Sequence, residues 1–474
     1  MIRLHFASTP SHRLAGLKQS LGPVRDARLK FVFPDGHGLG AMVGNSRPLR
    51  LRNAFRWWWS FWIVFFLSGL VFNPHSGVPA ALDAAKIYRI AAVSCVAFSI
   101  CILALAGCRI TSALRCLCAG PLGWLVLYTS IGFMSVFWSV QPLWTAYKMM
   151  EYMIGLVLVA TTMSNTGKLE NYEALFDLVW LLYAGLLLTV WAGVIAWPDA
   201  AVKQLKGGSE ATIPFRLAGV LPVVHPNGVG AIAATLAIVA LARYFSRGGQ
   251  LRYAVYCGLC LATLFLSQSR SAWFSFSCGL FVVAYAARRI RLMMFLGLAV
   301  CFGLLLSSTP WQYFLRGQDI SQVIELSGRI KMWGLALSFI TRRPLFGYGA
   351  MTGTRFLLAP LAPFGEDFAY SGADNVFIEV LLGVGGAGLV PLVASVLAVW
   401  STLASELKYN KGKNVGGVAN YALEGLGVLA VNMGLSLFTA GVFIWHPPVV
   451  WLLIVGYASL LRWRSKAYAC FARA

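Results

Sequence analysis

The stretch SGRIKMWGLALSFITRRPLFGYG, residues 327–349, interrupts a chain that otherwise consists largely of long apolar runs. It lies inside a polar segment, roughly Thr309 to Asn375, that separates two of those runs and closes with GADN at 372–375. Residues 328–340 carry apolar side chains at helical spacing but are too few to cross a bilayer, so we expect a helix at the membrane interface. The segment is therefore predicted to be a loop outside the membrane that gathers polar, cationic and acidic side chains.

The composition is that of a polytopic membrane protein. Of 474 residues, 58% are hydrophobic and only 12% are charged, against about 25% charged residues in soluble domains. The mean hydropathy is +0.71, and the apolar runs reach the ~17–25 residues that a membrane-spanning helix needs. We therefore expect an all-α fold in one membrane domain, residues 57–462, with about twelve transmembrane helices. The predicted runs lie approximately at 57–73, 88–107, 120–139, 148–163, 174–197, 226–245, 251–267, 271–287, 291–308, 376–400, 416–440 and 448–462.

The charge distribution predicts the orientation. The net charge is +22, and with both termini in the cytoplasm the inner segments hold about twice as many Lys and Arg as the outer ones, as the positive-inside rule requires. The basic arm at 1–56, predicted to be poorly ordered, and the tail at 463–474 are then cytoplasmic. This pattern fits contact with anionic lipid better than contact with nucleic acid. The loop at 309–375, between the ninth and tenth helices, carries six cations on the outer side against the rule, and anion binding would explain them.

Three arginines from separate outer connections are the main binding candidates, because an arginine near hydrocarbon is costly unless it has a function. Arg216, Arg270 and Arg329 together could hold a diphosphate bidentately. The alternative is that each contacts a lipid phosphate or the C-terminus of a helix. Polar neighbours of these arginines and of the GADN sequence add further candidates for substrate binding: His225, Asn227, Gln268, Asn375 and Glu379.

Asp374 is the candidate general base, because a sugar hydroxyl that attacks an anomeric carbon must lose its proton. The alternative role is the N-cap of the following helix, which suits an aspartate. Glu379 is expected inside the bilayer near its outer face, where an acid needs a partner, either an arginine or the substrate. His225 precedes Pro226 and is also expected to mark the start of a helix. Lys148 and Glu151 are expected to pair with each other.

The sequence GVGGAG at 383–388 formally fits the dinucleotide-binding pattern, but it lies within an apolar run with no strand before it. Close helix packing is the better interpretation. The sequence contains no Walker A pattern and no clustered metal ligands. We therefore expect neither a cofactor nor a metal.

The order of the motifs resembles the O-antigen ligase and Wzy-type polysaccharide polymerase superfamily, including ExoQ-like exopolysaccharide polymerases. The resemblance spans approximately residues 57–462. The motifs that carry it are R-x-x-G and HPN within 216–227, QSRS at 268–271, SGRxxxW at 327–333, RPLFGYG at 343–349, and DNxxxE at 374–379 before a glycine-rich helix.

This resemblance implies a GT-C-like, metal-independent glycosyltransferase of the bacterial inner membrane. Its partners would be an undecaprenyl-diphosphate-linked glycan donor, a glycan or lipid-linked acceptor, membrane lipid and a chain-length regulator. Arg216 and Arg270 would bind the donor diphosphate. Many members carry His-Asn where this chain has Asp374–Asn375, which weakens the ligase assignment specifically. We therefore expect a polymerase of O-antigen or exopolysaccharide repeats. The alternatives are a ligase that transfers glycan to the lipid A core, a flippase for lipid-linked oligosaccharide and a non-catalytic assembly partner.

Overall fold

A computed structural model divides the chain into two units, Met1–Arg52 and Asn53–Ala474. The first unit and the rest of the predicted basic arm at 1–56 lie outside the described residues. The described ranges are 59–70, 84–105, 110–118, 120–166, 169–204, 213–291, 312–313, 315–316, 329–358, 361, 373–409, 418–439, 441–444 and 448–471.

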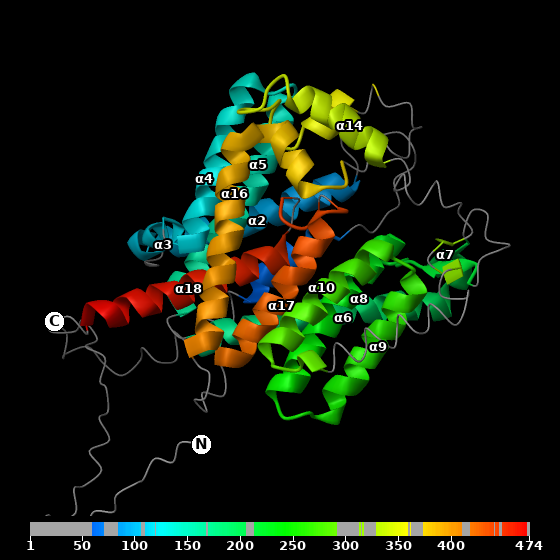
Figure 1. The fold of residues 1–474 in the computed structure, drawn as a ribbon. Helices are drawn as coiled ribbons and strands as arrows, with labels where there is room; N and C mark the ends of the chain where they lie inside the picture. The colour runs from blue at the N-terminus through cyan, green and yellow to red at the C-terminus, as the bar shows by residue number, and fades with distance from the viewer. Residues whose placement is uncertain are drawn as a thin grey trace, which may run out of the picture. The chain divides into compact units, whose positions relative to one another are not determined.

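The described part of the second unit is almost entirely helical (Figure 1). A short segment at 59–67 is helical, and the named elements follow it along the chain. They are α2 (Ala84–Leu105), α3 (Ile110–Leu117), α4 (Gly120–Met134), the 3-10 helix η1 (Ser135–Trp138), α5 (Pro142–Thr166), α6 (Leu169–Ala196), α7 (Pro198–Ala201), β1 (Val202–Gln204), β2 (Phe215–Leu217), α8 (Pro226–Ser246), α9 (Leu251–Ser267), α10 (Arg270–Ala286), α14 (Arg329–Ile340), the π-helical turn η4 (Gly353–Leu358), α16 (Val376–Tyr409), α17 (Val418–Ser436) and α18 (Val449–Phe471).

Five helical segments of the described chain are long and apolar enough to cross a membrane, which fits the polytopic class. They are α4 with η1, α5, α6, α8 and α16. Most of the other expected runs also coincide with helices, but the ninth, 291–308, falls almost wholly outside the described residues, so the count of twelve stays a prediction. The antiparallel pair β1–β2 and helix α3 were not expected. Helix α18 extends through Phe471, into the predicted tail.

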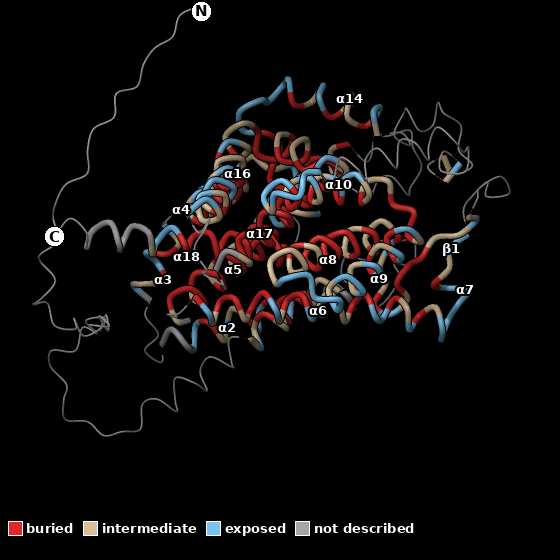
Figure 2. Tube along the Cα trace, turned by 60° about the horizontal axis from the view of Figure 1, so that its bottom comes forward, coloured by how far each residue is buried: buried red, intermediate tan, exposed pale blue. Residues whose placement is uncertain are grey.

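Residues 421–436 of α17 and 449–461 of α18 form the most enclosed part of the described bundle (Figure 2). Helix α8 packs against α9 and α10, and α10 packs closely along α17. Glycines permit this approach: a Cβ at Gly279 would lie 2.6 Å from Val431, and one at Gly434 would lie 2.8 Å from the Ser275 Cα. Small residues at helix contacts are the usual device in membranes, where backbone proximity stabilises packing.

The glycine-rich segment of α16 is a break in the helix. Gly385 has φ 64° and ψ −163°, and the chain at 344–349 supplies backbone hydrogen bonds there. The Tyr348 and Gly349 amides donate to the carbonyls of residues 382 and 383 at 2.9 and 2.8 Å, and the Gly386 amide donates to Pro344 at 2.8 Å. The RPLFGYG and glycine-rich sequences are therefore two halves of one packing unit, which positions α14 and the start of α16.

Candidate functional site

Arg216 is held at the turn between α9 and α10. It lies on β2, opposite Lys203 of β1, and its Nε donates to the Ser267 carbonyl at 3.0 Å. Its Nη2 donates to Asn227 Oδ1 at 2.6 Å. The β-ladder and α8 thus fix this guanidinium against the last turn of α9. Asn227 orients the arginine in this structure.

The α9–α10 turn places Arg270 beside Arg216. Gln268 adopts a left-handed conformation, φ 50°, and its side-chain amide donates to the carbonyls of Ile213 and Phe215 at 2.9 and 2.7 Å. Ser269 caps α10 by accepting from the Ala272 amide, so Arg270 is the first residue of that helix. Gln268 is only 2% exposed, and its observed role is to fasten the β2 segment to this turn.

Arg316 joins the same cluster and is the residue that the sequence motifs missed. Its Nη2 donates to the Gln268 carbonyl at the end of α9. Burial and the charges of Arg216 and Arg270 lower the pKa of Arg316 to about 9, and burial together with Arg270 lowers that of Arg216 to about 10. Both values lie above neutral pH, so the guanidinium groups remain cationic. The signal in the sequence was the unexplained excess of cations in the outer loop.

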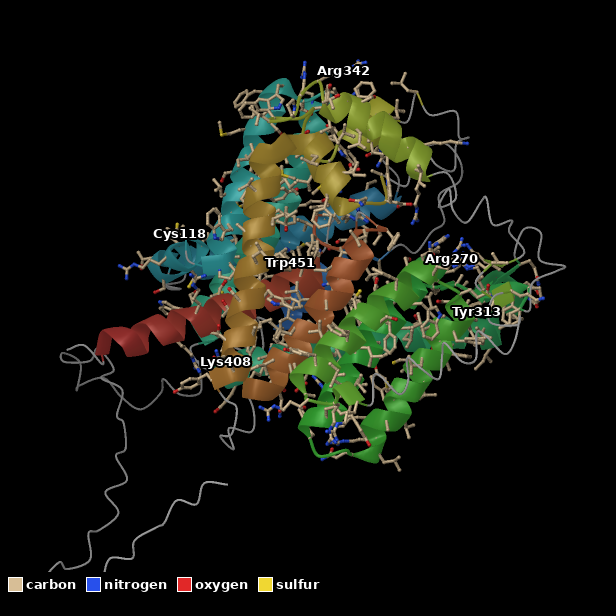
Figure 3. All side chains as sticks on the ribbon, viewed as in Figure 1. Cys118, Arg270, Tyr313, Arg342, Lys408 and Trp451 are labelled. Carbon is tan, nitrogen blue, oxygen red and sulfur yellow. The ribbon has the colours of Figure 1, made fainter. Side chains whose placement is uncertain are left out.

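Two aromatic side chains support this region. Tyr313 stacks on Phe265 with ring centroids 4.7 Å apart, and its hydroxyl donates to the Phe265 carbonyl at 2.6 Å. Figure 3 shows Tyr313 and Arg270 at the same end of α10. The stacked pair thus fastens the segment that carries Arg316 to α9.

His225 is the N-cap of α8, as expected of a histidine before Pro226. Its Nδ1 accepts from the Asn227 amide at 3.2 Å. Burial, followed by the charges of Arg216 and Lys203, lowers the pKa of His225 to about 4. The imidazole is therefore neutral at physiological pH and adds no charge to the cluster.

Asp374 forms an ion pair with Arg329, the first residue of α14, at 2.9 Å. The N-cap of α16 is instead Asn375, whose Oδ1 accepts from the amides of Phe377 and Ile378 at 2.9 and 3.1 Å. The alternative that Asp374 caps the helix is therefore wrong. Burial raises the pKa of Asp374, and Arg329 partly offsets that rise. The carboxylate is thus free of a capping role and is moved toward the basicity that proton transfer near neutral pH requires.

The turn that carries Asp374 is held from both sides. Trp333 of α14 donates its indole N–H to the Ala373 carbonyl at 2.7 Å. Glu379, 2% exposed, accepts from the Ala373 amide at 3.3 Å and from the Thr354 hydroxyl of η4. Among the described residues, Glu379 forms no ion pair with an arginine. In this structure Glu379 therefore supports the turn from inside the protein.

Helix α14 has the predicted extent, but its apolar side chains divide between two faces. Met332, Ala336 and Ile340 are buried, whereas Ile330 and Leu337 are about half exposed. The buried face packs with Tyr348 of the 344–349 segment and Leu382 of α16, and the other face is partly exposed. Arg329 thereby lies at the end of a helix fixed on one side by protein.

Electrostatic and hydrogen-bonded links join the candidate residues into a series. The positive charge of Arg270 is felt electrostatically by Arg216 and Arg316, and that of Arg329 is felt by Arg270. Arg329 in turn forms an ion pair with Asp374. Within the described ranges, no group of three or more His, Cys, Asp and Glu side chains is arranged to hold a metal ion. The arrangement can bind a polyanion through arginines and remove a proton nearby.

Two other charged clusters differ from these arginines because each pairs opposite charges within the protein. Lys148 and Glu151 pair at 2.7 Å, as the sequence predicted, and both are buried. At the far end of α8 from His225, Arg243 pairs with Glu424 of α17 and with Asp177 of α6, each at 2.7 Å. Both clusters have their opposite charges in contact and resemble structural ion pairs.

The family model described as O-antigen ligase, Wzy_C, matches residues 255–393, less than a third of the chain. The match confirms the resemblance to the O-antigen ligase and Wzy superfamily, whose members are glycosyltransferase-like ligases and polymerases. It includes most of α9, all of α10 and α14, and the start of α16, hence Gln268, Arg270, Arg329 and Asp374. Arg216, His225 and Asn227 precede it. No curated protein matches the chain.

Proposed function

We propose that this integral membrane protein, whose residues 255–393 match the O-antigen ligase family, is a glycosyltransferase that polymerises undecaprenyl-diphosphate-linked repeats. It would act on the periplasmic side of the bacterial inner membrane, with both termini in the cytoplasm. The observation that carries the proposal is the Arg329–Asp374 ion pair, together with Arg270, whose guanidinium lies within electrostatic range of both Arg216 and Arg329. It combines a polyanion site with a carboxylate that has no capping role.

The proposed reaction is one displacement at the anomeric carbon of the donor sugar. The acceptor hydroxyl oxygen forms the new bond to that carbon, and its proton passes to the Asp374 carboxylate. The bond from the anomeric carbon to the phosphate oxygen breaks, and the electron pair leaves with undecaprenyl diphosphate. Attack from the side opposite the leaving group inverts the anomeric configuration.

The arginines supply the electrostatic part of the catalysis. Negative charge grows on the leaving diphosphate in the transition state, and guanidinium groups already fixed by protein contacts stabilise it without reorganising. Arg216 is held by Ser267 and Asn227. Arg270 begins α10, where the positive end of the helix dipole also favours an anion.

In this proposal the remaining polar residues position the protein around the site, because their side chains are hydrogen-bonded to other protein groups. Asn227 orients Arg216, Gln268 fastens β2, His225 starts α8, and Asn375 caps α16. Glu379 holds the Ala373 amide. In this proposal none of these five needs to touch the sugar.

A ligase that transfers the finished glycan to the lipid A core is the second candidate, favoured by the description of the matched family. The aspartate at 374, where many family members have histidine, favours the polymerase. A flippase is less well supported, because its ionisable residues would be expected near the bilayer midplane, whereas Arg216, Arg316 and Asp374 all lie on connections outside the helices.

Analysis of lipid-linked glycans in a deletion strain separates these functions. Loss of a polymerase leaves single repeats on the lipid, loss of a ligase leaves long lipid-linked polymer that never reaches lipid A, and loss of a flippase leaves repeats on the inner leaflet. Complementation with Arg270→Ala should give no polymer while the protein stays in the membrane. Arg342→Ala is the matched control, since Arg342 is exposed and contacts the Phe339 ring. Normal chain lengths with Arg270→Ala would refute the diphosphate role.

A further inference from the structure

Arg316 has the one buried guanidinium nitrogen in the described chain that lacks a partner. Its Nη2 donates to the Gln268 carbonyl, but its Nε is buried without any hydrogen bond. Leaving a charged donor unpaired in the protein interior is costly. A ligand acceptor beside Arg316 would remove that cost.

Arg316 and Arg216 both donate hydrogen bonds to backbone carbonyls at the end of α9. Arg216 binds the carbonyl of Ser267, and Arg316 binds the carbonyl of the next residue, Gln268. Arg270 begins the following helix after one intervening residue. Two guanidinium groups therefore donate to consecutive carbonyls of a tight turn. A third, that of Arg270, lies at the start of α10.

Arg329 has a different environment. It pairs with Asp374 at 2.9 Å, and each of these side chains keeps about a fifth of its surface exposed (21% and 20%). Its charge is therefore already balanced by a carboxylate. A guanidinium that is committed to the candidate base is a poor third ligand for a diphosphate.

We propose that Arg316 supplies the third guanidinium of the diphosphate site, beside Arg216 and Arg270, and that Arg329 is instead the positioning residue for Asp374. The inference rests on the proposed function and refines it. Three clustered cations repel one another in a partly buried site, and a diphosphate diester with two negative charges offsets most of that repulsion. Its oxygens can also accept from the free Nε of Arg316.

The competing explanation is that Arg316 only caps α9, where a cation near the helix C-terminus is favourable. In that case its removal would lower stability without changing anion affinity. Measurements of binding and of unfolding on the same variants distinguish the two explanations.

The experiment measures binding of undecaprenyl diphosphate, undecaprenyl monophosphate and inorganic pyrophosphate to the full-length protein in nanodiscs. The variants are Arg270→Ala, Arg316→Ala, Arg316→Lys, Arg329→Ala and the control Arg342→Ala. Loss of a charge-assisted hydrogen bond predicts that Arg316→Ala binds the lipid diphosphate about 10- to 100-fold more weakly. Arg316→Lys keeps the charge but loses the planar fork, so it should bind with intermediate affinity and remain informative if the alanine variant does not fold.

Two further results are expected. Arg329→Ala should bind the lipid diphosphate within about twofold of the wild type and yet transfer glycan more slowly. The wild type should prefer the diphosphate to the monophosphate, and pyrophosphate should compete with both if the phosphates alone are recognised. If the lipid diphosphate binds tightly but pyrophosphate does not compete with it, the protein recognises the isoprenoid rather than the phosphates. That result would overturn the three-arginine site.

The failures can be told apart. Wild-type affinity in both Arg316 variants, together with weak binding by Arg270→Ala, would overturn the role of Arg316 and leave the proposed function standing. Loss of diphosphate binding in Arg329→Ala would overturn the assignment of Arg329. If the wild type itself does not bind the lipid diphosphate, the proposed function fails.

Discussion

Replacement of Asp374 by asparagine removes the candidate base while keeping the shape of the site. The residue has φ 49°, and asparagine tolerates this left-handed conformation as well as aspartate does. Asn375 still caps α16, and Trp333 still holds the Ala373 carbonyl. The backbone of the turn should therefore persist in the variant.

The expected loss of rate is much larger than the expected loss of stability. General base catalysis contributes about 10²- to 10⁴-fold, or about 2.7–5.5 kcal/mol of activation free energy. The Arg329–Asp374 pair is partly solvent-exposed, so its loss should cost about 1 kcal/mol of unfolding free energy. A defect in catalysis can thus be separated from a defect in folding.

The assay follows the conversion of a labelled lipid-linked repeat to longer chains by purified protein in nanodiscs, with thermal unfolding measured in parallel. Asp199→Asn is the matched control, because Asp199 lies in α7 and is exposed. A rate for Asp374→Asn within tenfold of the wild type, with normal substrate binding, would refute the role of Asp374 as base.

Three further changes test the site and its framework. Arg329→Ala removes the charge that lowers the pKa of Asp374 and leaves the burial that raises it. The acid limb of the pH–rate profile should therefore move to higher pH. An unchanged limb, or a move to lower pH, would contradict the pairing of Arg329 with Asp374. Gly385→Ala places a Cβ 2.3 Å from the Leu345 carbonyl at φ 64° and should destabilise the protein by more than the ~1–2 kcal/mol of left-handed strain, whereas Gly386→Ala, with 3.6 Å of clearance, should unfold at nearly the wild-type temperature. Arg243→Ala leaves the buried Glu424 without its ion-pair partner and should lower the free energy of unfolding by about 3 kcal/mol, measured by thermal unfolding. The control is Arg247→Ala, which removes a hydrogen bond to the Tyr253 hydroxyl; an equal loss in the two variants would contradict a structural role for Arg243.

The apolar periodicity predicted most of the described helices because a run of about twenty apolar residues has few other stable arrangements in a bilayer. It could not predict the break at Gly385, which depends on backbone groups of residues 344–349 that arrive from a different part of the chain. Nor could it show which face of α14 is buried, since both faces are apolar.

The candidate site was predictable in its residue types and less so in its pairings. Motif order singled out Arg216, Arg270 and Asp374, but adjacent Asp374 and Asn375 are both good caps, and only the fold shows that Asn375 takes that role. Arg316 lies in no motif. Its place beside the α9–α10 turn follows from a long-range contact with Gln268, which local spacing does not encode.

The most direct test of the transferase proposal is release of undecaprenyl diphosphate by the purified wild-type protein supplied with a single lipid-linked repeat. We predict one undecaprenyl diphosphate released for each glycosidic bond formed, with chains of two or more repeats as the product and no release by Arg270→Ala. Movement of intact lipid-linked repeats across the bilayer without release, or equal release by Arg270→Ala, would contradict it.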